Sequence, residues 1–317
     1  MSEKNESHGP SMGSEEPVVD DGVDIETKRF RDRFVKVMMQ SPLALGGLIV
    51  TCLVLIVGIL APVLAPYDPS ASYDSFVEPM SHSTGGEFHV LGTNAFGQDV
   101  LSRIIYGTRI SIGIAIAAGA VAVIVGTLLG LISAYYGGWV DDIIMRYIDF
   151  QWAFPAIVLA IGIIAFIGEV GATNVVIALG IAYITEFARL VRGEVLSIRE
   201  KEYIMAAEAV GMSDWRIMTR EILPNAVAVI IVQLTLMLPL VILGEAGLSF
   251  LGVGVNVETP SWGMMLSRGQ DFINQAWWLS VFPGIAIVIT VVAFNLFGDG
   301  LRDAFDVSEQ IEEGGTR

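Results

Sequence analysis

Four charged side chains lie within or at the end of otherwise apolar segments, and these groups are the most able to do chemistry inside the chain. Glu169 lies at the end of one segment, Glu186 and Arg189 stand three residues apart in the next, and Glu245 lies in a later one. A charge in an apolar environment is costly unless it is paired, hydrogen-bonded or in contact with water. Glu245 either lines a translocation path and binds a cationic group of a solute, or hydrogen-bonds a neighbouring helix. The structural role is the one that we favour.

The sequence patterns of common catalytic sites are absent. The chain has no G-x-x-x-x-G-K-[ST] loop to cradle ATP phosphates and no H-E-x-x-H zinc helix. Its histidines, His8, His82 and His89, lie outside the apolar segments, and Cys52 is its only cysteine. We therefore expect that the chain is not an enzyme, that it holds no catalytic residue, metal or cofactor, and that it has no nucleic-acid partner.

A polar interruption at 202–225 carries the most specific spacing in the chain. Tyr203, Ala206, Ala207 and Val210 follow the i, i+3, i+4, i+7 template of one face of an amphipathic helix. The small alanines on that face would allow a partner surface to approach closely. This face is therefore a candidate docking element.

The residues that follow predict a turn and a second helix. Gly211 tolerates the left-handed conformation in which helices commonly end, and Ser213 can cap a new helix by accepting a backbone N–H. Pro224 closes the pair, because proline cannot donate to a helical ladder and disfavours helix in the preceding residue. The second helix is expected to expose three apolar side chains, Trp215, Met218 and Ile222.

Composition indicates an integral membrane protein. The chain has 317 residues, of which 53% are hydrophobic and 16% charged, and a mean hydropathy of +0.63. A helix needs about 20 residues to cross a hydrocarbon core, and the continuous apolar runs lack the alternation of barrel strands. We predict an all-α fold with six transmembrane helices, at 43–64, 110–135, 143–167, 174–191, 226–251 and 278–297.

The distribution of lysine and arginine predicts the orientation, because basic residues near spans remain in the cytoplasm. A basic cluster at 28–36 precedes the first span, and a second one at 189–220 surrounds the polar interruption. Both termini and the interruption are therefore expected in the cytoplasm, with the chain as a multi-pass protein of the plasma membrane. Three basic residues fall on the outer side, Arg103, Arg109 and Arg268.

The two ends of the chain are acidic. Eight acidic residues stand against one lysine in 1–27, and six stand against two arginines from residue 299 onward. We expect a disordered cytoplasmic tail and basic segment at 1–40, a six-helix membrane domain at 41–300 with an outer loop at 67–108 and a cytoplasmic loop at 200–225, and an acidic, disordered tail at 301–317. A net charge of −16 also suggests a halophilic source.

The polar interruption resembles the "EAA" loop of ABC importer permeases. The family pattern has two alanines, a glycine four residues after the second, and a later Leu-Pro. These are Ala206 and Ala207, Gly211, and Leu223 with Pro224 in this chain, whereas Met205 stands where the pattern has glutamate. The resemblance implies that this loop couples the membrane domain to a cytosolic ATPase.

Further stretches resemble the permeases of dipeptide, oligopeptide and nickel importers. The segment HVLGTNAFGQDVLSRIIYGTRISIGI is similar to a Gly-Thr-Asp and Gly-Arg-Asp-Val-Leu pattern, from which Asn94 and Gln98 depart. The last third, with GEAGLSFLGVGV, PSWGMML and FPGIAIVITVVAFNLFGDGLRDAFD, is also similar to those permeases. The order and spacing of these stretches cover most of the chain.

The stretch YYGGWVDDIIMRYIDFQWAFP is similar to the tight turn and third helix of the same permeases. Two glycines supply the reversal, and Asp141 favours a helix N-terminus through the helix dipole. Arg146 and Asp149, three residues apart, predict an intrahelical ion pair.

The resemblance implies a transport subunit that works by alternating access. Its partners would be a second permease, two cytosolic subunits that bind ATP and an extracellular solute-binding protein, all within a lipid membrane. Arg216 and Arg220 would add charge-assisted contacts to the ATPase, with a solvated surface as the alternative for them. Two other functions stay open, an ion-coupled secondary transporter and a membrane scaffold that binds a cytosolic partner.

Overall fold

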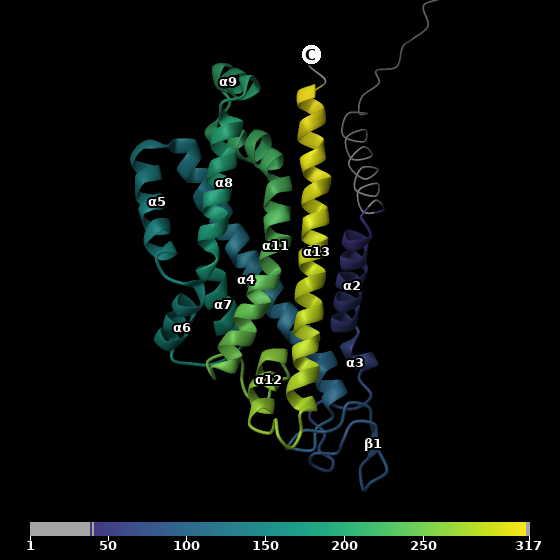
Figure 1. Ribbon diagram of the computed structural model, residues 1–317. Helices are drawn as coiled ribbons and strands as arrows, with labels where there is room; N and C mark the ends of the chain where they lie inside the picture. Colours follow the sequence, from purple (N-terminus) through teal and green to yellow (C-terminus); the bar gives the residue numbers. More distant parts are fainter. Residues whose placement is uncertain (1–38, 40, 315–317) are drawn as a thin grey trace, which may run out of the picture.

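The computed structural model describes Met39 and residues 41–314, with the side chains of 306–314 outside the description. Most of the described residues are helical, and the sheet among them is one small two-stranded hairpin, which confirms the all-α fold. Five helices are long and apolar enough to span a membrane, and a bent helix pair makes a sixth span if the pair is counted as one. Figure 1 shows a bundle of upright helices. The tail predicted at 1–40 lies almost entirely outside the described residues.

The elements follow one another along the chain in a simple order. Those of the first half are α2 (Pro42–Ile59), α3 (Ala61–Leu64), β1 (Ser81–His82), β2 (Phe88–His89), α4 (Val100–Tyr136), α5 (Gly138–Trp152) and α6 (Ala156–Ile167). Those of the second half are α7 (Ala172–Ala182), α8 (Ile184–Arg199), α9 (Glu202–Ala209), α10 (Asp214–Arg216), a π-helical turn (Ile217–Ile222), α11 (Leu223–Phe250), α12 (Trp262–Gln270) and α13 (Trp278–Gly314).

Short polar side chains begin the helices on both sides of the bundle. Ser41 accepts a hydrogen bond from the Ala44 N–H at 3.3 Å, directly before α2. Asp99 accepts one from the Ser102 N–H at 2.8 Å at the start of α4. Each cap satisfies one of the N–H groups that a helix start leaves without a partner.

The third predicted span, 143–167, is not one continuous helix. Helices α5 and α6 meet at an angle of 95°. Pro155 lies at the break, where it lacks an N–H and disfavours helix in the residue before it. The next span also has a break, because Tyr183 separates α7 from α8. The chain thus bends sharply within the third predicted span, whereas Tyr183 interrupts the fourth without dividing Ala172–Arg199 into two spans.

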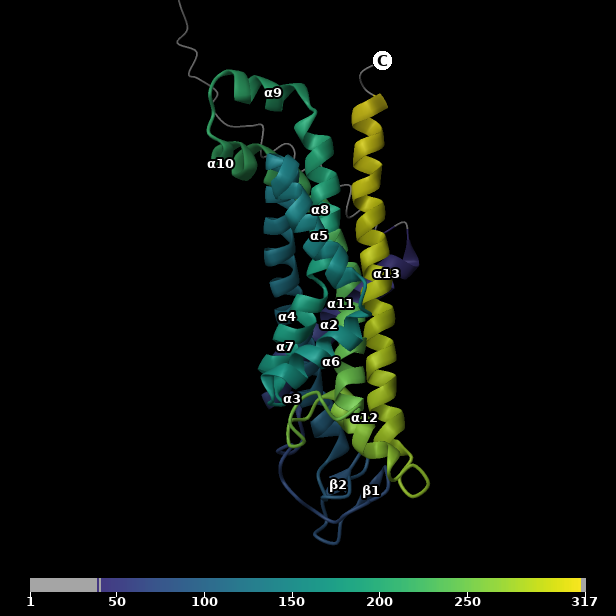
Figure 2. The same cartoon turned by 90° about the vertical axis from the view of Figure 1, so that its left-hand side faces the viewer.

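The C-terminal part of the chain differs from the expected disordered tail. Helix α13 continues through residue 301 to Gly314 without a break, so the prediction of a disordered end is wrong up to that residue. Figures 1 and 2 place the end of α13 at the same end of the bundle as α9 and α10. The strands β1 and β2 and helix α12 lie at the opposite end, which we refer to as the outer end after the orientation predicted from the basic residues.

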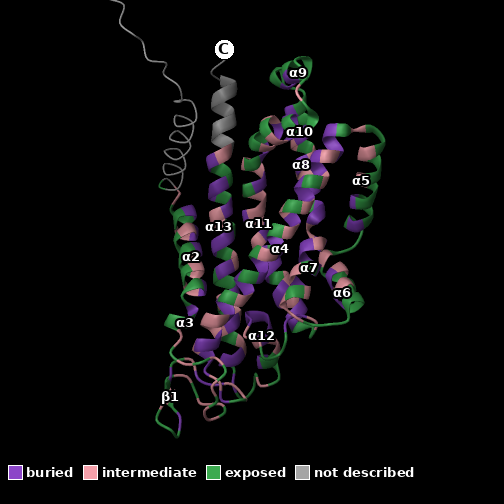
Figure 3. Cartoon of the chain, turned by 180° about the vertical axis from the view of Figure 1, so that it is seen from behind, coloured by how far each residue is buried: buried purple, intermediate pink, exposed green. Residues whose placement is uncertain are grey.

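The core lies between α4 and the helices that cover it, α7, α8 and α11. Gly126 and Gly130 of α4 permit the close approach of α8: a Cβ at these positions would lie 2.6 Å from the Phe187 Cβ and 2.5 Å from the Ala188 carbonyl oxygen. Small residues at such crossings let helix backbones pack closely in a membrane. Figure 3 shows buried residues along this centre, and exposed residues over much of α5 and α6 at the edge.

Candidate functional site

The polar interruption folds as the predicted helix, glycine and helix. Helix α9 ends at Ala209, and Gly211 follows with a φ of +79°. The Met212 N–H donates to the Ala207 carbonyl at 3.1 Å across this turn. Helix α10 begins after Ser213, although the Ser213 side chain makes no capping hydrogen bond. The predicted turn at Gly211 is therefore present. Ser213 stands at the predicted N-cap position, but its side chain does not accept the predicted hydrogen bond. We name residues 202–224 the coupling hairpin.

The coupling hairpin is anchored by two buried side chains and exposes several apolar ones. Ile204 is fully buried and Ala207 is 9% exposed, whereas Ala206 is exposed. The exposed apolar side chains are Tyr203, Met205, Val210 and Trp215, with Val210 80% exposed and Trp215 66% exposed. The two alanines thus lie on different sides of α9, one toward the protein and one toward solvent. This apolar surface lies at the end of the bundle, beyond α8 (Figure 2).

The second helix of the coupling hairpin is continuous with α11, contrary to prediction. A π-helical turn joins them, and the Leu223 N–H donates to the Met218 carbonyl five residues earlier. Pro224 occupies the first turn of α11, where a missing N–H does not break a ladder. Met218 and Ile222 are 3% and 0% exposed, so the prediction that they are exposed is wrong. Helix α10 is therefore continuous with a helix that is long and apolar enough to span a membrane.

Helix α4 reaches the coupling hairpin through polar contacts that sequence reasoning missed. The Tyr135 hydroxyl donates to Asp214 Oδ1 at 3.2 Å. Arg199, at the end of α8, donates to the Ala134 carbonyl at 3.3 Å and lies over the Tyr135 ring. These contacts attach Asp214 of the coupling hairpin, and the end of α8 that precedes the hairpin, to the end of α4. No spacing in the sequence brings residues 135 and 214 together.

The charged and phenolic groups of the coupling hairpin face solvent. Arg216 and Arg220 are exposed, and neither makes an ion pair with another described residue. Partial burial, with a further contribution from the charge of Glu221, raises the pKa of Tyr203 above its ordinary value. The surface therefore presents the cations of Arg216 and Arg220 together with the exposed carboxylates of Glu202, Glu208 and Asp214, beside its apolar side chains.

Two ion pairs attach α5 to α8. Arg192 donates to both carboxylate oxygens of Asp141, at 2.7 and 2.6 Å. Arg189 donates to Asp149 at 2.6 Å. The predicted intrahelical pair of Arg146 with Asp149 is therefore wrong, because the bend of the chain brings Arg189 to this carboxylate instead.

Glu245 is enclosed between three helices. It is 0% exposed and accepts hydrogen bonds from Ser111 at 3.1 Å and Ser249 at 2.8 Å. Ser111 also accepts the Trp262 N–H at 3.2 Å, which adds the start of α12 to the network. Glu245 thus connects α4, α11 and α12, and the described residues leave it no open surface.

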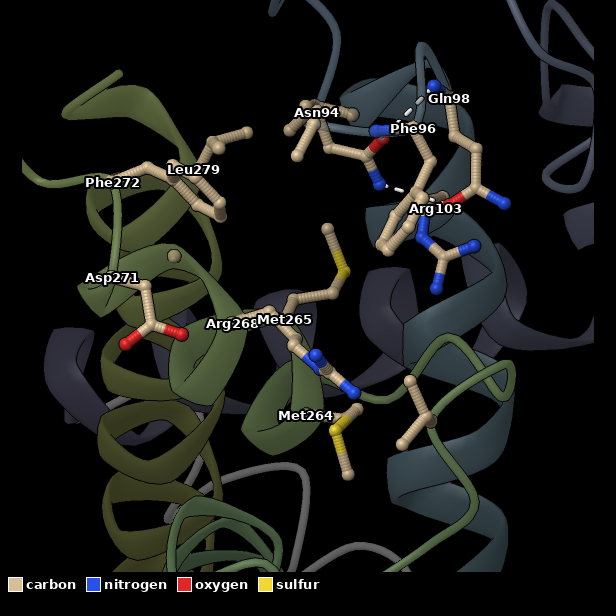
Figure 4. A pocket seen from close by; sticks show the side chains of 14 residues that line it. Asn94, Phe96, Gln98, Arg103, Met264, Met265, Arg268, Asp271, Phe272 and Leu279 are labelled. Atoms are coloured by element: carbon tan, nitrogen blue, oxygen red, sulfur yellow. Dashed lines mark hydrogen bonds between the residues drawn. The ribbon is translucent and has the colours of Figure 1, made fainter. Parts of the chain in front are cut away.

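A pocket lies at the outer end, between the start of α4 and helix α12 (Figure 4). Its walls combine the methionines Met264 and Met265 with the cation of Arg268. The Asn94 amide donates to Gln98 Oε1 at 2.9 Å beside it. Asn94 and Gln98, the two residues that depart from the family pattern, are thus hydrogen-bonded to each other. They form a neutral pair where the pattern has an aspartate and an arginine. Their spacing of four residues was the signal available in the sequence.

The outer loop contains a buried polar pair that the sequence did not reveal. His89 Nδ1 lies 2.8 Å from Asp99 Oδ1, and the two side chains are 0% and 1% exposed. The other oxygen of Asp99 accepts from the Ser102 hydroxyl at 2.7 Å. This cluster attaches β2 to the start of α4 and so fixes the loop on the bundle.

Comparison with known proteins gives the family. Residues 126–308 match the model of the binding-protein-dependent transport system inner membrane component, and residues 30–79 match the N-terminal TM domain of oligopeptide transport permease C. The chain is 44% identical over 278 residues to the dipeptide transport system permease protein DppC of Alkalihalophilus pseudofirmus, covering 87% of this chain and 89% of the relative. It is 42% identical over 293 residues to the glutathione transport system permease protein GsiD of Pectobacterium atrosepticum, covering 92% of this chain and 94% of that relative.

A solved structure supports the fold. An inward-facing form of the MetNI methionine ABC transporter aligns with a TM-score of 0.53 and 18% identity, over 64% of this chain and 96% of that chain. At this identity the likeness concerns the fold alone. The matched family models, the permease relatives and the apolar spans agree with one another: the chain is an integral membrane protein that belongs to the family of binding-protein-dependent transport system inner membrane components, the permease subunits of ABC importers.

Proposed function

We propose that this permease subunit forms half of the translocation path for small peptides. The named relatives are permeases for dipeptides, di- and tripeptides and glutathione, all of which are short peptides, and this favours peptides over nickel. A second permease would complete the path, an extracellular binding protein would deliver the solute at the outer end, and the ATP would be bound by partner subunits. The complex would lie in the plasma membrane, with both termini of this subunit in the cytoplasm.

The observation that carries the coupling proposal is the exposed apolar surface of the coupling hairpin. Val210 and Trp215 are exposed beyond the end of α8, on a rigid turn attached to α4 through Asp214. Large apolar side chains that stay exposed together mark an interaction site. A cytosolic ATPase seated there would move α10, and the continuous helix would transmit the displacement to α11 within the membrane. Ala206 is exposed on the same surface, and Leu223 and Pro224 lie in the first turn of α11, where the hairpin joins that helix.

A matched pair of valine substitutions tests this proposal. Val210→Asp places a charge on the surface, and Val170→Asp places one on the exposed connection between α6 and α7 at the outer end, where Val170 is 48% exposed. Burying an unpaired carboxylate in an apolar interface is costly. We expect Val210→Asp to lower the amount of ATPase subunit that co-purifies with the chain by at least about tenfold. Equal recovery of the ATPase with both variants would contradict the proposal.

A further inference from the structure

Two adjacent spans are interrupted at a similar depth in the bundle: α5 and α6 meet at 95°, and the single residue Tyr183 separates α7 from α8 within one span. Helix α6 has 12 residues and α7 has 11, so each break lies about 16 to 18 Å from the outer end of its span at 1.5 Å per residue. A hydrocarbon core is about 30 Å thick, which places both breaks near its middle. Broken helices at membrane depth are tolerated where they are enclosed by protein or line a water-filled cavity. In transporters such breaks commonly surround the solute.

A cavity with polar groups lies at these breaks. It has a volume of about 320 Å³ and is lined by Gln151, Trp152, Ala153, Phe154, Tyr183 and Glu186, among others. The Gln151 amide donates to the Ile181 carbonyl at 2.6 Å, which fixes the orientation of the side chain. Its other atom, Oε1, is buried and has no hydrogen-bond partner, and the residue as a whole is 5% exposed. An acceptor of hydrogen bonds is thus held ready beside the cavity.

Glu186 is the charged group of this cavity. It is exposed, and it makes no ion pair with any described residue. Arg189, one turn away, is already engaged, because it donates to Asp149 and lies 4.2 Å from the centre of the Trp152 ring. A carboxylate without a partner in the middle of a span is too costly to face lipid. This face of α8 must therefore border water or another polar surface.

We propose that this cavity is a wall of the solute path and that it binds a cationic amino group of the solute. Glu186 supplies the negative charge, and Gln151 Oε1 supplies a second acceptor for an ammonium N–H. The free amino terminus of a peptide has this chemistry. The inference rests on the proposed transport of peptides, and it adds the place in this subunit at which the solute is recognised.

Thiol labelling tests the cavity without a need to know the solute. The sole cysteine, Cys52, is exposed on α2 and is replaced by alanine. Ala153→Cys then places a thiol at an exposed position in the cavity with little change in size. Native membranes that contain the assembled complex are treated with a cationic or an anionic methanethiosulfonate. The chain with its native Cys52 is the control for a thiol on an apolar helix.

We expect the thiol introduced by Ala153→Cys to react, and Cys52 to remain unmodified in the control. Since a carboxylate attracts cations and repels anions, the ratio of cationic to anionic rates at the introduced thiol should exceed that of a thiol in solution by about tenfold. Glu186→Gln should return the ratio to the solution value while expression of the chain stays the same. Phe154→Cys, also in the cavity, is the second labelling position if Ala153→Cys does not assemble.

Two results would overturn the inference. If the thiols introduced at positions 153 and 154 react no faster than Cys52, the cavity does not contact water. If they react but the charge ratio is the same with Glu186→Gln, the cavity is wet but does not select cations. ATP-driven uptake by the parent complex in the same membranes separates this outcome from a failure of the proposed function, because uptake by the parent persists when only the cation site is wrong.

Discussion

Replacement of Gly211 by valine tests whether the shape of the coupling hairpin matters for transport. The φ of +79° is in the left-handed region, and a Cβ built on Gly211 meets no atom within 4 Å. The cost is therefore one of backbone conformation alone, about 1 to 2 kcal/mol for a residue with a side chain. Such a cost lowers the ratio of the native turn to its alternative conformations by a factor of about 5 to 30 without removing any membrane span. We expect normal insertion together with a loss of ATP-driven uptake of up to this factor.

Two controls make this prediction specific. Gly193→Val introduces the same side chain into α8, where the backbone is helical and a Cβ also meets open space, so uptake should stay near the parent level. Gly211→Asn should retain most uptake, because asparagine tolerates the left-handed conformation. Uptake into membrane vesicles that contain all subunits is the assay. If Gly211→Val and Gly193→Val transport equally well, the turn does not act as a rigid hinge and the reasoning is refuted.

Three further substitutions test the polar contacts. Gln98→Arg alone should lower the apparent unfolding midpoint in detergent, and Asn94→Asp together with Gln98→Arg should restore it, because the two side chains are 2.9 Å apart. A midpoint of the double variant below that of the single variant would argue against the pairing. A double-mutant cycle on Asp141 and Arg192 should give a coupling of about 1 to 2 kcal/mol, since the pair is bidentate and half-buried, and a coupling near zero would show that the pair adds nothing. Glu245→Ala should lower the stability of the folded chain by about 2 kcal/mol, because the hydroxyls of Ser111 and Ser249 lose their acceptor, and Glu245→Gln should lower it by less. Equal losses of stability in the two variants would show that the hydrogen bonds are not the cause.

The spans and the hinge were predictable from the sequence because their causes are local. Apolar runs of about 20 residues are long enough to cross a bilayer, whichever neighbours they acquire. Gly211 adopts the left-handed conformation for the same reason that it was singled out, its lack of a Cβ. The proline at 155 was also visible, and its meaning as a break was overlooked because the apolar run continues through it.

The details that failed depend on contacts between distant segments. Asp149 has a candidate partner three residues away, but the 95° bend brings Arg189 to it instead. Met218 looked exposed on an isolated second helix, and it is buried because the π-helical turn joins that helix to α11. Neither the partner of Asp149 nor the burial of Met218 can be predicted from the neighbouring residues in the sequence. The prediction of a halophilic source is not tested by these contacts and stays a prediction.

The central claim is that the coupling hairpin contacts the ATPase, and crosslinking within the membrane tests it most directly. A photo-reactive phenylalanine analogue replaces Val210 in one variant and Val170 at the outer end in another. We expect light to join the Val210 variant, but not the Val170 variant, to a subunit that contains a G-x-x-x-x-G-K-[ST] loop. Crosslinks from Val210 to lipid alone, or equal crosslinks to the ATPase from both positions, would contradict the claim.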